Sequence, residues 1–138
     1  MKSTKILVQA TLAADMQKVW DYYTKPEYIT KWNFASDDWH CPSASNDMKI
    51  GGKYLARMEA KDGSFGFEFS ATYDSIAPGE SFQYTIEDGR IVYVNFEKAG
   101  NNTLIKVEFE AESVNSIELQ KGGWQAILDN FKKFTESN

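Results

Sequence analysis

Residues 115–135 read NSIELQKGGWQAILDNFKKFT, and this stretch decides the fold. Its larger apolar side chains recur at the spacing that forms one stripe along a helix: Trp124, Ile127, Leu128, Phe131 and Phe134. Asn115, with Glu118 three residues later, is typical of a helix start. Lys132 and Lys133 suit the negative end of the helix dipole. A helix of this length with one apolar stripe requires a surface that covers it.

Two consecutive glycines, Gly122 and Gly123, interrupt this pattern just before Trp124. Each costs on the order of 1 kcal/mol relative to alanine in a helix interior, so two interpretations stay open. In the first, the regular helix begins only near Gly123 and the glycines form the joint before it. In the second, the missing side chains let the helix approach a sheet, or a molecule bound against the sheet.

The composition indicates one acidic globular domain covering residues 1–138. A chain of 138 residues can bury about two-thirds of its unfolded surface in one core. The formal net charge of −5 argues against a nucleic-acid-binding protein, which requires a basic surface. The chain is rich in aromatic residues, with nine Phe, seven Tyr and four Trp. This excess indicates a cavity wall.

Several features point to the cytoplasm. No stretch approaches the ~20 apolar residues of a membrane span, so no membrane insertion is expected. Residues 1–4 lead directly into a strand-like segment without a signal-peptide core. Cys41 is the single cysteine, which excludes an internal disulfide and agrees with a reducing compartment.

The first third of the chain predicts one strand and two short helices. Residues 5–12 alternate as a strand does. Asp15 is a candidate cap for a short amphipathic helix that carries Trp20. Thr24 and Glu27 have capping-box spacing around a proline, which predicts a second short helix ending near Trp32.

The middle of the chain predicts a loop followed by a run of strands. Residues 33–47 show no period, which predicts an irregular, aromatic-rich loop. Apolar residues then alternate with polar ones in four segments, at residues 53–59, 65–74, 82–86 and 104–111. A further strand at residues 91–97 has apolar residues on both faces, so its inward face stays open. Glycine-containing turns separate them, most clearly Asp62-Gly63 and Asp88-Gly89.

This order of elements predicts an α+β fold. Adjacent strands joined by tight turns form an antiparallel sheet, here of six strands with the first strand included. The inner face of a curved sheet needs a cover, and the terminal helix is the one element long enough. Two short helices after the first strand close one end. We therefore expect a space between helix and sheet, either filled by aromatic side chains or open to a ligand.

The chain resembles a known class, and the resemblance rests on framework residues spread over nearly its whole length. They are Val19-Trp20, Tyr28 and Trp32, the run Asp47-Met48-Lys49-Ile50-Gly51-Gly52-Lys53-Tyr54, Arg57-Met58, Asp62-Gly63, the run Tyr73-Asp74-Ser75-Ile76-Ala77-Pro78-Gly79-Glu80, Tyr84, Gly123-Trp124 and Leu128. With these residues, the order of elements is similar to the helix-grip fold of START-like (SRPBCC) proteins, which include the major birch pollen allergen and bacterial polyketide cyclases. More narrowly, the chain resembles homologues of the activator of the 90-kDa heat-shock-protein ATPase.

The resemblance implies a hydrophobic pocket between helix and sheet, which members of these families use for lipids, hormones or polyketides. It also implies two alternatives to simple ligand binding. One is an adaptor that binds a chaperone and stimulates its ATPase. The other is an enzyme similar to polyketide cyclases or hydrolases. The residues that motivate this alternative are His40, Tyr84 and a possible Arg57–Glu68 pair inside the cavity.

Residue chemistry gives weak support to catalysis. His40 and Cys41 are neighbours, but a nucleophile needs a base in facing geometry, and the chain has no second Cys or His for a zinc site. We therefore predict no metal, no cofactor and no catalytic residue. Arg57 and Glu68 fit a cross-strand ion pair on the wet face of the sheet. The alternative, that they form a polar anchor inside the cavity, stays open.

The leading hypothesis is a non-enzymatic protein that encloses a small apolar ligand. Its candidate ligand-binding residues come from separate segments: Trp32, Phe34, Trp39, His40, Met58, Phe67, Phe69, Tyr84 and Trp124. Trp39 and His40 are predicted at the cavity mouth, and the Tyr84 hydroxyl is predicted to orient the ligand. For each aromatic taken alone, core packing is the competing interpretation. A homodimer stays open.

Overall fold

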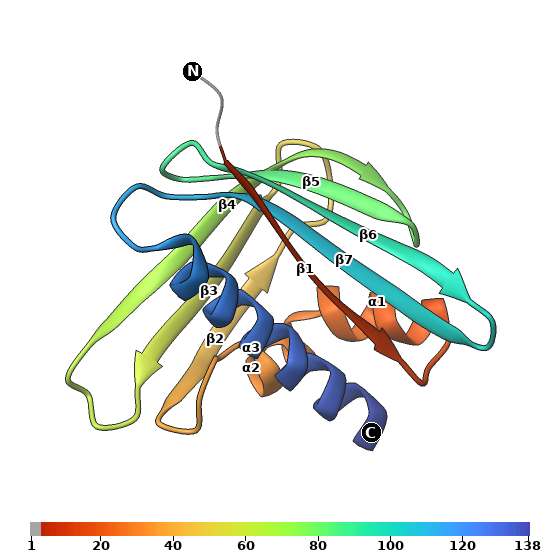
Figure 1. Ribbon diagram of the computed structural model, residues 1–138, viewed down its shortest axis with the longest axis horizontal. Helices are drawn as coiled ribbons and strands as arrows, with labels where there is room; N and C mark the ends of the chain where they lie inside the picture. Colours follow the sequence, from red (N-terminus) through yellow and green to blue (C-terminus); the bar gives the residue numbers. More distant parts are fainter. Residues whose placement is uncertain (1–3) are drawn as a thin grey trace.

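The computed structural model describes residues 4–138, and most of them lie in one curved sheet with three helices (Figure 1). The elements follow the order β1 (Lys5–Leu12), α1 (Met16–Thr24), α2 (Pro26–Trp32), β2 (Trp39–Asn46), β3 (Lys53–Ala60), β4 (Gly66–Ala77), β5 (Ser81–Ile86), β6 (Ile91–Ala99), β7 (Asn102–Glu110) and α3 (Ile117–Ser137). This is the predicted α+β helix-grip architecture. The expectation that residues 1–4 contain no signal-peptide core falls largely on residues 1–3, which lie outside the described residues.

The sheet has seven strands rather than the six predicted, in the order β1-β7-β6-β5-β4-β3-β2, and all neighbours are antiparallel. The additional strand is β2, which occupies most of the predicted loop at residues 33–47. Its sequence, WHCPSASN, has no clear alternation, and its register with β3 shifts between His40 and Ser43. Backbone pairing with β3 therefore creates this edge strand, and side-chain period gives no sign of it.

The core lies on the concave face, where alternate residues of each strand are buried. Val92, Val94 and Phe96 of β6 point inward, as do Ile105, Val107 and Phe109 of β7. α3 lies across this face with Leu128 and Phe131 buried beneath it (Figure 1). The predicted cover for the sheet is thus confirmed.

Side chains of α3 also protect the free edge of the sheet at β1. The Gln125 amide accepts a hydrogen bond from Gln9 N and donates one to Gln9 O. The Lys132 ammonium donates to Thr11 O. Because an unpaired edge strand invites association with other chains, these contacts close the edge and fix α3 on the sheet.

The helix starts differ in part from the predictions. Asp15 caps α1 as predicted, accepting a hydrogen bond from Lys18 N at 2.9 Å. Thr24 does not cap α2, because its hydroxyl donates to Trp20 O within α1, and the N-cap is Lys25. In α3 the N-cap is Ser116 rather than Asn115. Asn115 and Ser116 are both good N-cap residues, so the sequence alone does not show which of the two caps α3; the backbone conformation decides it.

Neither interpretation of the glycine pair describes the structure fully. Gly122 and Gly123 lie inside α3, so they are not a joint before it. A Cβ atom added to either one meets nothing within 4 Å, so no close approach of the sheet requires glycine. The predicted turns at Gly63 and Gly89 do need glycine, with φ of +77° and +97°.

Candidate functional site

A cavity of about 250 Å³ lies between α3 and the concave face of the sheet. It brings together six of the nine predicted site residues: Trp32, Met58, Phe67, Phe69, Tyr84 and Trp124. They come from five elements, namely α2, β3, β4, β5 and α3. Val8, Val107, Ile127 and Leu128 complete the apolar side of the wall on β1, β7 and α3. The predicted space is therefore present, and aromatic rings form much of its lining.

Three predicted site residues lie outside this lining. Phe34 borders a separate surface hollow beside Asn130 and Lys133 of α3. Trp39 packs against Phe67, with ring centroids 6.1 Å apart, but on the outer side of that ring. His40 lies with its Nε2 3.7 Å from Glu59 Oε1, both side chains being partly exposed. Trp39 and His40 were expected in a loop at the cavity mouth, but both lie in β2, where successive side chains point to opposite faces of the sheet.

The cavity opens where the β3–β4 hairpin extends past the end of β5. Ile86 of β5 pairs with Ala71, whereas β4 continues back to Gly66 without β5 beside it. Phe67 on this extension lines the cavity and is 41% exposed, so it connects the interior with the surface. Phe65, at the start of the alternating segment 65–74, is 61% exposed at the hairpin end. The alternation of apolar residues cannot show where a neighbouring strand stops.

The end of the cavity nearest α1 and α2 is polar, which sequence reasoning did not predict. The Tyr73 hydroxyl donates to Asn46 Oδ1 at 2.7 Å, and Asn46 Nδ2 donates to Thr24 O at 2.7 Å. Asn33 Nδ2 lies 3.4 Å from the Tyr54 hydroxyl, which is a long hydrogen bond. The tyrosines occupy inward positions of β3 and β4, a signal that sequence alternation carries. Asn33 follows the end of α2 and Asn46 is the last residue of β2, and neither position carries such a signal.

Two tyrosine hydroxyls at the cavity lack a protein partner among the described residues. Tyr84 is 5% exposed, and neither its hydroxyl nor that of Tyr23 forms a hydrogen bond within residues 4–138. Both hydroxyl oxygens remain accessible to a water-sized molecule, and both residues line the cavity, so the hydroxyls open on it. Burial raises the pKa of both phenols well above the ordinary value, and neighbouring tyrosines add to the effect. These hydroxyls are therefore neutral donors available to a bound molecule.

Arg90 is the cationic side chain in the lining, and it too was missed. It belongs to the turn between β5 and β6, where Ile86 N donates to Arg90 O at 2.8 Å. Its position continues the inward row of Val92, Val94 and Phe96, a parity that could have indicated it. A charge in the turn after Asp88-Gly89 nevertheless looks solvent-exposed in sequence, because turns usually are.

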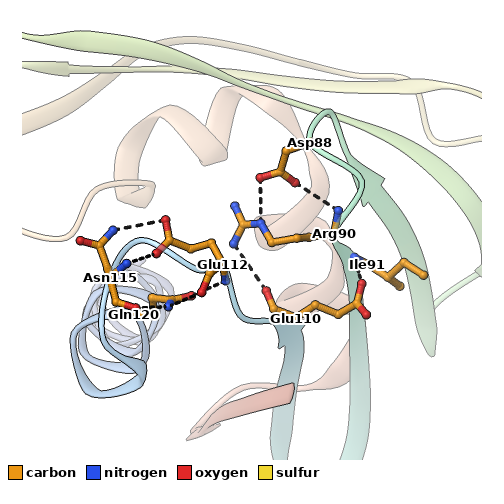
Figure 2. A network of polar contacts seen from close by, with 7 residues as sticks. All are labelled: Asp88, Arg90, Ile91, Glu110, Glu112, Asn115 and Gln120. Carbon is orange, nitrogen blue, oxygen red and sulfur yellow. Dashed lines mark hydrogen bonds and ion pairs between the residues drawn. The ribbon is translucent and has the colours of Figure 1, made fainter. Parts of the chain in front are cut away.

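Polar contacts around Arg90 connect the turn to β7, and a second, neighbouring set of contacts connects the loop after β7 to the start of α3 (Figure 2). Arg90 Nε donates to Asp88 Oδ2 at 2.8 Å, and Arg90 Nη1 lies 3.5 Å from Glu110 O. Beside it, the buried Gln120 side chain accepts from Glu112 N and donates to Glu112 O. The loop after β7 is thereby fastened to the first turns of α3, at the same end of the molecule as Arg90.

The cavity lining combines apolar side chains with hydroxyl, amide and guanidinium groups. Among the described residues that line the cavity, none is Asp, Glu, His, Cys or Lys. Within residues 4–138 no group of three or more His, Cys, Asp and Glu side chains is placed to hold a metal ion. Cys41 is buried, its pKa is raised by burial, and its thiol donates to Ser43 O. Arg57 is the register partner of Glu68, but its ion pair is with Glu59, at 2.8 Å and partly exposed.

A family model described as Activator of Hsp90 ATPase homolog 1-like protein matches residues 13–136. The chain belongs to this family. The match begins just after β1 and ends in the last turn of α3, so it includes every element that lines the cavity except β1. A search of curated protein sequences gave no match.

Two solved structures of bacterial proteins are similar over nearly the whole chain. The AHSA1-like protein from Aeromonas hydrophila has 36% identity and a TM-score of 0.91, covering 97% of this chain and 93% of that one. Chr148 from Cytophaga hutchinsonii has 46% identity and a TM-score of 0.84, with the same coverage of both chains. CalU16 from Micromonospora echinospora, at 19% identity and a TM-score of 0.71, covers 96% of this chain and 76% of that one and shares the fold.

No helix within residues 4–138 combines the length and apolar character needed to cross a membrane. α3 is the longest helix, and its polar face carries Lys121, Asp129 and Lys133. Its apolar stripe faces the sheet of the same chain.

Proposed function

We propose that this protein binds a small, largely apolar molecule in the cavity between α3 and the sheet. The observation that carries the proposal is an aromatic-lined space of about 250 Å³ into which buried hydroxyls open without a protein partner. Native cores are packed with few voids larger than a water molecule. An apolar cavity of ~150 Å³ suffices to bind benzene, so this one has room for a larger planar or short-chain molecule.

The polar groups support the same reading. The Tyr23 and Tyr84 hydroxyls have no partner within residues 4–138, so both can hydrogen-bond to an oxygen or nitrogen of a bound molecule. Their distribution at a mainly apolar wall is typical of small-molecule sites, where a few polar groups fix orientation.

The chaperone-adaptor and enzyme alternatives have less support from the geometry. The adaptor alternative has its motivation in the family description. The enzyme alternative relied on His40 acting with Tyr84, yet His40 pairs with Glu59 outside the cavity lining and Tyr84 lies inside it. Ligand binding is the function for which the cavity itself provides an observation.

The test is a binding experiment on the isotope-labelled protein with a panel of aromatic hydrocarbons and short fatty acids. Amide and side-chain resonances of Met58, Phe69 and Trp124 should shift on titration. Met58→Trp fills the cavity from β3 and should abolish these shifts, because Met58 is 8% exposed and lines the space. Phe65→Trp places the same residue outside the lining and is the matched control. Absence of any shift at the cavity with the whole panel contradicts the proposal.

A further inference from the structure

Arg90 is out of place for a purely apolar pocket. Desolvating a charge is expensive, and a guanidinium normally has its donors filled by carboxylates, carbonyls or water. Here the side chain is only 23% exposed and lines the cavity. No other Lys, Arg or His among the described residues does so.

The protein fills only part of the hydrogen-bonding capacity of Arg90. Nε is occupied by Asp88 at 2.8 Å, and Nη1 has a long contact of 3.5 Å with Glu110 O. Nη2 forms no hydrogen bond or ion pair within residues 4–138. The edge formed by the two terminal nitrogens is therefore the unfilled one, and this edge binds a carboxylate through two parallel hydrogen bonds.

The nearby acids are held by other groups. Glu110 Oε1 accepts a hydrogen bond from Ile91 N at 2.7 Å. Both carboxylate oxygens of Glu112 accept from Asn115, one from its backbone and one from its side chain. The Asp88 carboxylate accepts hydrogen bonds from Arg90 Nε and from the Arg90 backbone N–H, so it orients the guanidinium from the turn side. The terminal-nitrogen edge is thus left for a group that enters through the cavity.

The position of Arg90 sets the orientation of such a group. Arg90 lies in the turn beside the end of β5, where Phe67 and Phe69 of β4 extend past that strand and Trp124 of α3 contacts Phe69. A flat apolar body that packs against Phe69 and Trp124 from the cavity side would place its polar end at the mouth near Arg90. Its opposite end would face the Tyr84 and Tyr23 hydroxyls.

We propose that the ligand of this cavity is an aromatic or similarly flat carboxylic acid, and that Arg90 binds its carboxylate at the mouth. This rests on the proposed function and adds a ligand class and a residue that selects it. Arg90 is a specificity-determining residue in this account. The phenylalanines and tryptophan bind the body of the molecule whatever its charge.

The test compares three probes of one shape: naphthoate, naphthamide and methylnaphthalene, substituted at the same ring position. Affinities are measured by calorimetry at neutral pH and low salt for the unmodified protein, Arg90→Gln and Arg90→Lys. Arg90→Gln should weaken naphthoate binding about tenfold or more, the value of a charge-assisted hydrogen bond, and leave methylnaphthalene within about twofold. Arg90→Lys should recover part of the loss, because it keeps the charge and not the planar edge.

Asp88→Ala separates the role of charge from that of structure. It removes the Asp88 contact to the turn and to Arg90 while the guanidinium stays. If Arg90 acts by binding the carboxylate, naphthoate affinity in Asp88→Ala stays the same or rises, since a negative charge beside the anion is gone. A loss equal to that of Arg90→Gln indicates that the network merely shapes the mouth, and this overturns the inference.

The remaining outcomes are also decisive. Equal losses for naphthoate and naphthamide in Arg90→Gln show recognition of a neutral acceptor oxygen and overturn the carboxylate assignment. Unchanged naphthoate affinity in Arg90→Gln overturns the inference as well. In both cases methylnaphthalene binding to the unmodified protein leaves the proposed function standing. If no probe binds the unmodified protein, the inference and the proposed function fail together.

Discussion

The indole of Trp124 lies face to face with the ring of Phe109, with centroids 4.0 Å apart and planes 11° apart. The same indole makes an edge contact with Phe69, at 6.3 Å between centroids. Trp124 therefore contacts β7 and β4 from α3 while its ring lines the cavity. One side chain thus connects helix packing with the proposed ligand site.

Trp124→Leu should lower the free energy of unfolding by about 1–3 kcal/mol, because it removes a stacked pair and alters the volume. It should also weaken methylnaphthalene binding. Trp20→Leu is the matched control, since Trp20 contacts Phe82 and Phe96 edge-on outside the cavity lining. Urea unfolding and calorimetry measure the two quantities. Equal binding by both variants would contradict a ligand-contact role for Trp124.

The glycine pair in α3 predicts a gain in stability on substitution. Gly122→Ala and Gly123→Ala should each raise the free energy of unfolding by about 0.5–1 kcal/mol, because alanine favours the helix and the added Cβ meets nothing within 4 Å. Gly89→Ala is the contrasting control. Its site is equally open, but its φ of +97° strains any L-residue, so stability should fall by about 1 kcal/mol. A loss in both α3 variants on thermal unfolding would indicate that the helix needs these glycines.

Thr103 and Thr135 are both fully buried but differ in their hydrogen bonds. The Thr103 hydroxyl donates to Ala14 O at 2.8 Å, whereas the Thr135 hydroxyl has no partner among the described residues. Thr135→Val should therefore stabilise the protein by about 1 kcal/mol, because it removes an unsatisfied group without changing the shape. Thr103→Val should destabilise it by about 1–2 kcal/mol. Urea denaturation compares them, and shifts of the same sign would contradict the assignment.

The tyrosines around the cavity predict alkaline unfolding. Burial raises the pKa of Tyr23, Tyr54, Tyr73 and Tyr84 above the ordinary tyrosine value of about 10. Above pH 10 the folded state therefore binds more protons than the unfolded state. The stability that these groups contribute is complete below that pH and is lost as the pH rises through the folded pKa values.

Phenolate absorbance and circular dichroism followed together through an alkaline titration should show that these groups ionise as the protein unfolds. Tyr84→Phe removes one of them, so its stability should fall less steeply with pH. Ionisation of all tyrosines with native circular dichroism retained would show that the cavity admits solvent freely enough to charge them.

Local patterns were sufficient where one face of an element is buried along its whole length. Ile105, Val107 and Phe109 alternate because one face of β7 is buried along the strand, and Leu128 and Phe131 follow the helix period because α3 covers the sheet. β2 could not be predicted this way. It is an edge strand defined by its backbone pairs with β3, and backbone groups are the same in every residue.

The sequence by itself determined the order of all elements except β2, the turn glycines, the aromatic residues of the cavity wall and the cover by α3. Only the tertiary structure decided that β4 continues past β5, that Phe67 lies at an opening and that Arg90 turns inward beside Asp88. The reason is physical. Periodicity reports which side of an element is dry, whereas a cavity depends on where separate elements end relative to one another. That relation is fixed by contacts between residues far apart in the chain.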